Sequence, residues 1–123
     1  MLSGIFGNAS AVNAENLANE LGPILIDGEQ IDQAFRLVRD LYVFTNKRLI
    51  LVDKQGLTGS KVEYHSIPYK SITHFAVETA GHFDLDSELK IWLSGVQQPI
   101  TKEFRKGSNI IEVQRTLARY ALR

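Results

Sequence analysis

The segment "YVFTNKRLILVD", Tyr42–Asp53, decides which fold the chain is expected to adopt. Two short runs rich in β-branched and aromatic residues flank four polar residues, and such runs are typical of buried strands. Between them, Asn46 and Lys47 form a candidate two-residue hairpin loop, because asparagine tolerates a positive φ. The segment therefore predicts a β-hairpin. It leaves open whether Lys47 and Arg48 bind an anionic ligand or only keep the tip hydrated.

Further strands are predicted on both sides of this hairpin. Their segments are "QAFRLVRD", "VEYHSIPY", "SITHFAVETA", "SELKIWLSG" and "QQPITKEFRKG". Most of them alternate apolar and polar residues, as a half-buried strand does. In "SELKIWLSG", for example, Leu89 and Ile91 lie on one face, opposite Lys90 and Trp92. The short links between them favour antiparallel pairing, since a parallel pair needs a long crossover. Together with the hairpin, these segments make about seven antiparallel strands.

A helix is predicted at each end of the chain. The first, in "NASAVNAENLANELG", has a thin apolar stripe and ends at Gly22, before Pro23. Because the stripe is thin, this helix is expected to pack on the domain or on a neighbouring subunit. The second, in "NIIEVQRTLARYALR", has a stronger stripe and begins after Ser108 or Asn109 as the N-cap. The residues of the two stripes are Ala14, Leu17, Ala18 and Leu21, then Ile110, Val113, Leu117 and Tyr120.

Composition limits the classes of function. The 123 residues fit a single domain, with residues 1–22 as an N-terminal helical extension and residues 25–123 as a barrel and C-terminal helix. Lys plus Arg and Asp plus Glu each total 14, so no global field draws the chain to nucleic acid or an anionic membrane. Without cysteine, disulfides and thiolate chemistry are excluded. We see no signal peptide or membrane-spanning run and expect a cytoplasmic protein.

Five segments in one unbroken order carry a family resemblance: "FTNKRLILVDKQGLTG", "YHSIPYKSI", "FAVETAG", "FDLDSELKIWLSG" and "IIEVQRTLARYAL". Over residues 25–123 the chain resembles the bacterial pleckstrin-homology-like family. The resemblance implies a mainly β fold, a barrel of about seven strands capped by the C-terminal helix. It also implies ring-like homo-oligomers and no enzymatic activity.

Eukaryotic relatives of that fold commonly bind phosphoinositides through basic residues between the first two strands. The corresponding segment here is "VRDLY", residues 38–42, which offers Arg39 beside Asp40. One cation next to a carboxylate is a poor cradle for a multiply charged headgroup. Membrane contact is therefore not expected.

The residues predict no catalytic, metal or cofactor site. His65, His74 and His82 are spaced too irregularly for a compact metal motif. Asp86 and its acidic neighbours in "HFDLDSE" lack the glycine and glutamate of a calcium loop, so turn capping is the preferred interpretation. An enzyme whose site is assembled from distant residues stays an alternative.

Two sets of residues are candidates for binding. A cation set could form an anion or partner patch, or could simply be charged strand ends: Lys47, Arg48, Lys54, Lys61 and Lys70. Leu17, Leu21 and Trp92 are candidate contacts between subunits. We therefore expect a non-enzymatic module that self-associates and acts in protein interaction or scaffolding. The alternative is binding of an anionic ligand or headgroup by the cation set.

Overall fold

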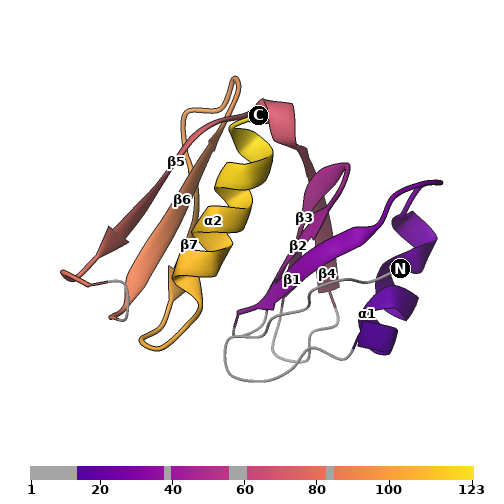
Figure 1. Ribbon diagram of the computed structural model, residues 1–123, viewed down its shortest axis with the longest axis horizontal. Coiled ribbons are helices and arrows are strands. Elements are labelled where there is room, and N and C mark those ends of the chain that lie inside the picture. The colour runs from indigo at the N-terminus through magenta and orange to yellow at the C-terminus, as the bar shows by residue number, and fades with distance from the viewer. Residues whose placement is uncertain (1–13, 38–39, 56–60, 83–84) are drawn as a thin grey trace. The chain divides into compact units, whose positions relative to one another are not determined.

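The computed structural model describes residues 14–37, 40–55, 61–82 and 85–123. Two compact units make up the chain, residues 1–67 and residues 68–123 (Figure 1). The helical elements are α1 (Ala14–Leu21), η1 (Gly22–Ile24), η2 (Tyr69–Ser71) and α2 (Ile110–Ala121). The strands are β1 (Ile31–Arg36), β2 (Leu41–Thr45), β3 (Arg48–Gln55), β4 (Lys61–Pro68), β5 (Ile72–Thr79), β6 (Ser87–Leu93) and β7 (Ile100–Phe104). Within the described residues, the predicted seven strands and two terminal helices are confirmed.

The first unit contains a four-stranded sheet in the order β1-β2-β3-β4. Phe44 of β2 lies opposite Leu49 of β3, which leaves Asn46 and Lys47 in the loop and confirms the predicted hairpin. The predicted positive φ at Asn46 is wrong, because no described residue other than glycine has a positive φ. Asn46 instead contributes through its side-chain hydrogen bonds, described below.

The central strands of this sheet, β2 and β3, are buried on both faces, whereas β4 is mostly exposed. On one face, α1 packs on the strands, with Leu17 and Leu21 only 3% and 0% exposed. The strand residues of that cluster are Ile31, Ala34, Leu41, Val43, Ile50 and Val52. The buried residues of the other face are Phe35, Tyr42, Phe44, Leu49 and Leu51. Burial on two sides explains why β2 and β3 are continuous apolar runs instead of alternating ones.

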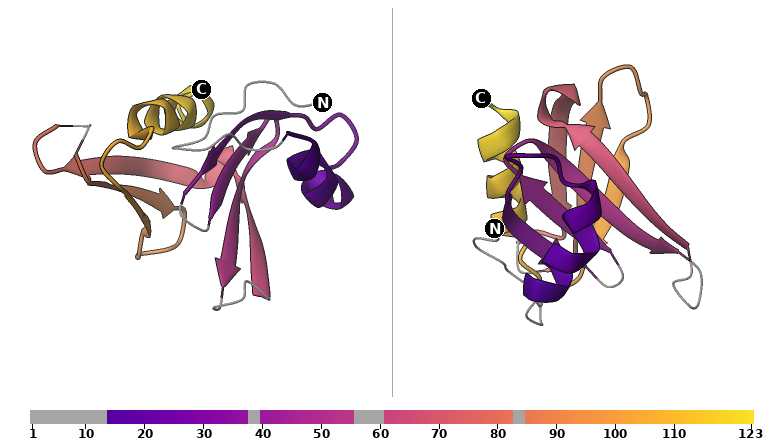
Figure 2. Two further views of the ribbon diagram at one scale, coloured as in Figure 1. Left: turned by 90° about the horizontal axis from the view of Figure 1, so that it is seen from below. Right: turned by 90° about the vertical axis from the view of Figure 1, so that its right-hand side faces the viewer.

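The second unit contains the three-stranded sheet β5-β6-β7, with α2 along one of its faces (Figure 2). In β6, Leu89 and Ile91 are fully buried, whereas Lys90 and Trp92 are only partly buried. The predicted division of this strand into an apolar and a mixed face is therefore confirmed. Near the end of α2, the ring of Tyr120 stacks on Tyr69 of η2 at 4.6 Å between centroids.

Several boundaries match their sequence signals. α1 ends at Leu21, immediately before Gly22, and β4 ends at Pro68. The N-cap position of α2 is Asn109, one of the two predicted residues, but its side chain makes no capping hydrogen bond to the helix. The predicted turn in "KQGLTGSK" and part of the turn in "GHFDLD" lie outside the described residues.

The packing of α1 generates a first prediction. A Leu21→Ala variant should lose about 2–4 kcal/mol of unfolding free energy, because it leaves a cavity in a buried cluster. Chemical denaturation at several protein concentrations measures this loss. It should be independent of concentration, since the contacts are within one chain. Asn19→Ala, on the exposed side of the same helix, is the control and should change stability by less than about 0.5 kcal/mol.

Candidate interaction site at the hairpin tip

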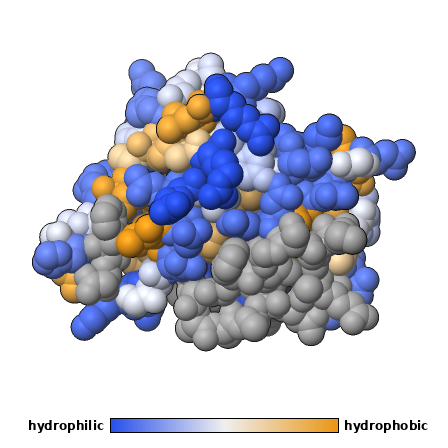
Figure 3. Space-filling model, in the orientation of Figure 1, coloured by the Kyte–Doolittle hydropathy of each residue, from blue (hydrophilic) through white to orange (hydrophobic). Residues whose placement is uncertain are grey.

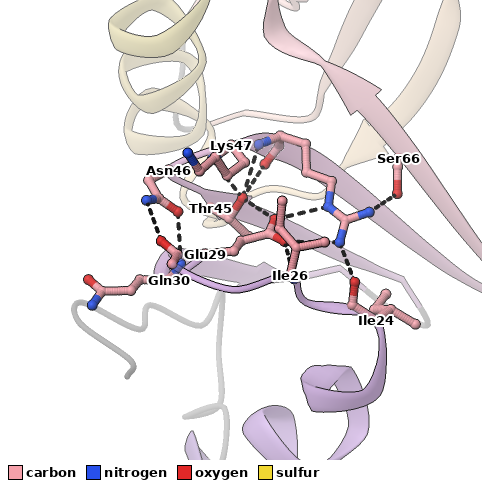
Figure 4. Close-up of polar contacts among 10 residues, drawn as sticks. Ile24, Ile26, Glu29, Gln30, Thr45, Asn46, Lys47 and Ser66 are labelled. Carbon is pink, nitrogen blue, oxygen red and sulfur yellow. Dashed lines mark hydrogen bonds and ion pairs between the residues drawn. The ribbon is translucent and has the colours of Figure 1, made fainter.

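A buried carboxylate lies at the centre of the polar contacts around the β2–β3 loop. The side chain of Glu29, just before β1, is 0% exposed and accepts four hydrogen bonds (Figure 4). Its Oε1 accepts from the Ile26 N–H at 3.1 Å, and its Oε2 accepts from the Thr45 hydroxyl at 2.7 Å. The other two come from Arg48. A buried charge needs such partners, because isolated burial of an ion is very costly.

Arg48, the first residue of β3, meets this carboxylate with two nitrogens. Its Nε lies 2.9 Å from Oε2 of Glu29, and its Nη2 lies 3.0 Å from Oε1. The remaining donors reach the Ile24 carbonyl and, at 2.8 Å, the Ser66 hydroxyl on β4. This planar two-nitrogen geometry is specific to arginine, since lysine has a single charged nitrogen. One side chain thus connects the hairpin, the segment after α1, and β4.

The amide of Asn46 ties the tip of the hairpin to the segment before β1. Its Oδ1 accepts from the Gln30 N–H at 2.8 Å, and its Nδ2 donates to the Gly28 carbonyl at 3.0 Å. Inside the loop, the Thr45 hydroxyl oxygen accepts from the backbone N–H groups of Lys47 and Arg48, both at 3.0 Å. The tip is therefore held by side chains that act as backbone substitutes.

The electrostatics of Glu29 follow from these contacts. Burial raises the pKa of its carboxyl, but hydrogen bonds from Arg48, Thr45 and the Ile26 N–H, together with the Arg48 charge, lower it by more. The net pKa is below the ordinary value of 4.5. The group is thus a carboxylate at neutral pH, and its contribution to stability depends on staying so.

Apolar and aromatic side chains near these contacts are exposed, and the hydroxyl of one of them, Tyr64, donates to Glu20 of α1 at 2.9 Å. Ile24 and Ile26 are 36% and 61% exposed, on the segment that Arg48 and Glu29 bind through its backbone. Tyr64 is 39% exposed on β4, two residues before the Ser66 that Arg48 also contacts. We call Ile24, Ile26 and Tyr64 the edge patch, because β4 is an edge strand of its sheet. In the view of Figure 3, apolar patches are small and separated by hydrophilic surface.

The structure does not gather the predicted cation set into one patch. Lys47 is exposed at the hairpin tip, whereas Lys54 and Lys61 lie at the other end of the β3–β4 pair, roughly 20 Å away along the strand. The guanidinium of Arg48 is occupied by Glu29, Ile24 and Ser66. Lys70 is exposed in η2 of the other unit.

The predicted subunit contacts are placed as follows. Leu17 and Leu21 are buried in the core of their own chain, which corrects the expectation that they are available to a partner. Trp92, expected to need cover from α1 or another subunit, stacks on the imidazole of His74 at 4.4 Å between ring centroids.

The described residues contain no group of three or more side chains suited to a metal ion. Within those same ranges, no helix is long and apolar enough to cross a membrane.

Sequence reasoning missed Glu29, Ile24 and Ile26. A glutamate in the polar segment "IDGEQID" has the pattern of a solvated turn, and nothing local marks it as buried. The only available signal was the Asp27–Gly28 turn before it, where Gly28 has a φ of 81°. That turn brings the Glu29 carboxylate back towards the Ile26 N–H.

The chain is similar to a protein family and to individual proteins of known sequence. The bacterial PH domain family matches residues 1–121. The uncharacterized protein YjqA of Bacillus subtilis strain 168 is 58% identical over 118 residues, which cover 95% of this chain and 94% of YjqA. The uncharacterized protein YozO of the same organism is 34% identical over 110 residues, 89% of this chain and 94% of YozO.

Two crystal structures are also similar. The pleckstrin homology domain from Shewanella amazonensis SB2B has a TM-score of 0.84 and 60% identity, over 95% of this chain and 94% of that one. A DUF1696 family protein with a pleckstrin-homology domain from Shewanella loihica PV-4 has a TM-score of 0.78 and 59% identity, over 94% of this chain and 99% of that one. These similarities confirm the predicted pleckstrin-homology-like fold.

The ion pair generates a second prediction. Arg48→Met should lose roughly 3 kcal/mol of unfolding free energy, because Glu29 is left buried without its charged partner. Lys47→Met, on the neighbouring exposed residue, is the matched control and should be nearly neutral. The double variant Glu29→Gln, Arg48→Met should recover part of the loss. Denaturation of wild type, the two single variants Glu29→Gln and Arg48→Met, and the double variant would show this. Simple addition of the two single losses would contradict a coupled pair.

The pKa of Glu29 generates a third prediction. Because its folded pKa is depressed, its stabilising effect is complete above pH 4.5 and disappears as pH falls through the folded pKa. The stability difference between wild type and Glu29→Gln should therefore be constant from pH 7 to about 5.5 and shrink below pH 4.5. Urea denaturation across this range measures it. A difference that stayed constant down to pH 3 would show that the carboxyl does not titrate as described.

Proposed function

Because this chain belongs to the bacterial PH domain family, we propose that it is a non-enzymatic, cytoplasmic module that self-associates into a ring-like homo-oligomer. In this form it serves as a protein-interaction or scaffolding unit. The ring and the lack of enzymatic activity are what the resemblance to this family implies. The site of self-association is proposed from the geometry of this chain.

The observation that supports self-association is the edge patch. Exposed apolar side chains beside an edge strand are typical of interaction surfaces. The segment carrying Ile24 and Ile26 is already ordered by Arg48 and Glu29. A partner therefore meets a preorganised surface, and association loses less conformational entropy.

Ring closure requires a particular type of contact. In a cyclic assembly of more than two copies, each interface is heterologous, so the edge patch of one copy meets a different surface of the next. Lys61 and Pro68 at the two ends of β4 suit this arrangement, since such residues prevent unlimited strand pairing along an edge. The proposed contact thus uses side chains beside the edge and not a continuous sheet.

The alternative, anion binding by the cation set, has less support in this geometry. Multiply charged ligands prefer several convergent donors. Lys47 stands apart from Lys54 and Lys61, and the charge of Arg48 is already neutralised by Glu29. Removal of Arg48 would also disturb the hairpin, so an Arg48 variant alone does not test ligand binding.

The edge patch generates a fourth prediction. Ile26→Asp should shift the protein towards smaller species, because a charge at a 61% exposed apolar position must be desolvated on association. Sedimentation equilibrium at about 10–100 μM, around typical weak-assembly affinities, measures the mass. Native mass spectrometry should show one closed oligomer for wild type.

The control is Val96→Asp, a similar change at a 53% exposed residue in the second unit. It should leave the mass unchanged, and both variants should keep the wild-type melting temperature to within a few degrees. A monomeric wild type would refute self-association. An oligomer that is insensitive to Ile26→Asp would refute the edge patch as its contact.

A further inference from the structure

Three glutamates lie side by side across the sheet of the second unit. Glu78 of β5 lies opposite Glu88 of β6, which in turn lies opposite Glu103 of β7. Directly opposed residues have Cβ atoms about 4.5–5.5 Å apart, and like charges there are destabilising. Lys90 binds Glu78 from the next position of the same face. Among the described residues, Glu88 and Glu103 have no ion pair of this kind.

This glutamate ladder borders a hollow of about 750 Å³ at the end of the sheet. Residues 68–123 contain eight Lys or Arg and six Asp or Glu, a net charge of +2, yet four of those six acidic residues line this one hollow. They are Glu78, Asp86, Glu88 and Glu103, and the cations of the lining are Arg105 and Lys106. The acidic character is therefore local and not a property of the whole unit.

A second feature of the hollow is an unsatisfied hydroxyl. Ser87 contributes to the lining, is only 6% exposed, and its Oγ has no hydrogen-bond partner among the described residues. Buried polar atoms almost always have a partner, which can be a ligand or an ordered water. The hollow thus combines an excess of carboxylates over cations with a buried hydroxyl on the neighbouring face of β6 that has no partner among the described residues.

An aromatic platform shares the sheet face of the ladder. His74 lies opposite Trp92 in the register, and their rings stack with an angle of 14°. The Thr73 hydroxyl lies 3.0 Å from Nδ1 of His74 and orients that ring. Because alternate residues of a strand share a face, Trp92, Lys90 and Glu88 point the same way, with about 13 Å between the first and the last.

An aromatic ring and carboxylates are the two kinds of group that bind organic cations. Lysine and arginine side chains pack over indole faces and form charged hydrogen bonds with carboxylates. We propose that this face, from Trp92 and His74 to the glutamate ladder, binds an extended Lys- and Arg-rich segment of a partner protein. The proposal rests on the protein-interaction half of the proposed function and does not require the ring.

The first unit of a second copy of this chain is a poor candidate for this partner. The cations described in residues 1–67 are dispersed, with Lys47 at one end of β3 and Lys54 at the other. Arg48 is bound to Glu29. A single metal ion fits less well, since the described residues form no metal-binding group. An extended segment matches both the length of the face and its two chemically different ends.

The test uses full-length protein and a hexaarginine peptide. Trp92 is the single tryptophan of the chain, so its fluorescence reports directly on this face. Binding should be measurable by calorimetry at low salt, weaken as salt is raised, and change the tryptophan emission. Glu88→Gln, Glu103→Gln should weaken binding roughly tenfold. Its melting temperature should be equal to or above that of wild type, because the opposed like charges are removed.

The matched control is Glu63→Gln, Glu112→Gln, which removes the same net charge on β4 and α2, outside the three strands that carry the ladder. It should change the affinity less than about twofold, because neither side chain belongs to the proposed contact face. Equal weakening by both double variants would mean a net-charge effect and would overturn the proposal. Three other results would also overturn it. These are unchanged tryptophan emission on binding, a melting temperature of Glu88→Gln, Glu103→Gln below that of wild type, and no binding of hexaarginine by wild type at low salt.

The same samples separate this inference from self-association. Sedimentation gives the mass of the free protein and of the protein with peptide. A monomer that binds the peptide at the ladder would refute the ring and support the proposed binding of a basic segment. An oligomer that does not bind the peptide would refute only the proposed binding of a basic segment.

Discussion

The pairing of the buried Glu29 carboxylate with Arg48 is the constraint on which the first unit depends. A charge taken out of water must find partners within the fold, and Glu29 finds four hydrogen bonds from three residues. To provide them, the hairpin tip and the segment after α1 must meet in one arrangement. The Ser66 contact of Arg48 adds β4 to the same arrangement. Three parts of the chain are thereby positioned by one ion pair.

This constraint changes how the surface of the unit is interpreted. Arg48 appears in the sequence as half of a cationic tip, but its charge is used inside the fold. The apolar residues that flank its contacts, Ile24 and Ile26, are exposed instead. The surface proposed for a partner is therefore apolar and preorganised, whereas local charge counting points to an electrostatic one. Preorganisation of this kind favours association without a large entropic loss.

In the second unit, carboxylates lie opposite one another instead of being paired with cations. Glu29 is fully paired, whereas the ladder of Glu78, Glu88 and Glu103 places like charges opposite each other with Lys90 as a partial counter-charge. Local features that oppose stability are expected mainly at functional positions, because elsewhere selection removes them. The contrast between the two units is the physical basis for proposing different surfaces for them, one for self-association and one for a basic partner.

Most of the secondary structure was determined by the sequence alone, because its signals are local. Residue alternation predicted the two faces of β6, and turn residues such as Gly22 and Pro68 marked the ends of elements. The tertiary structure decided the roles of individual polar residues. Glu29 and Arg48 are 19 positions apart, and the glutamate ladder exists only through the register of three strands. Neither relation has a periodic or adjacent signal in one sequence, since it arises only when distant segments are brought together by packing.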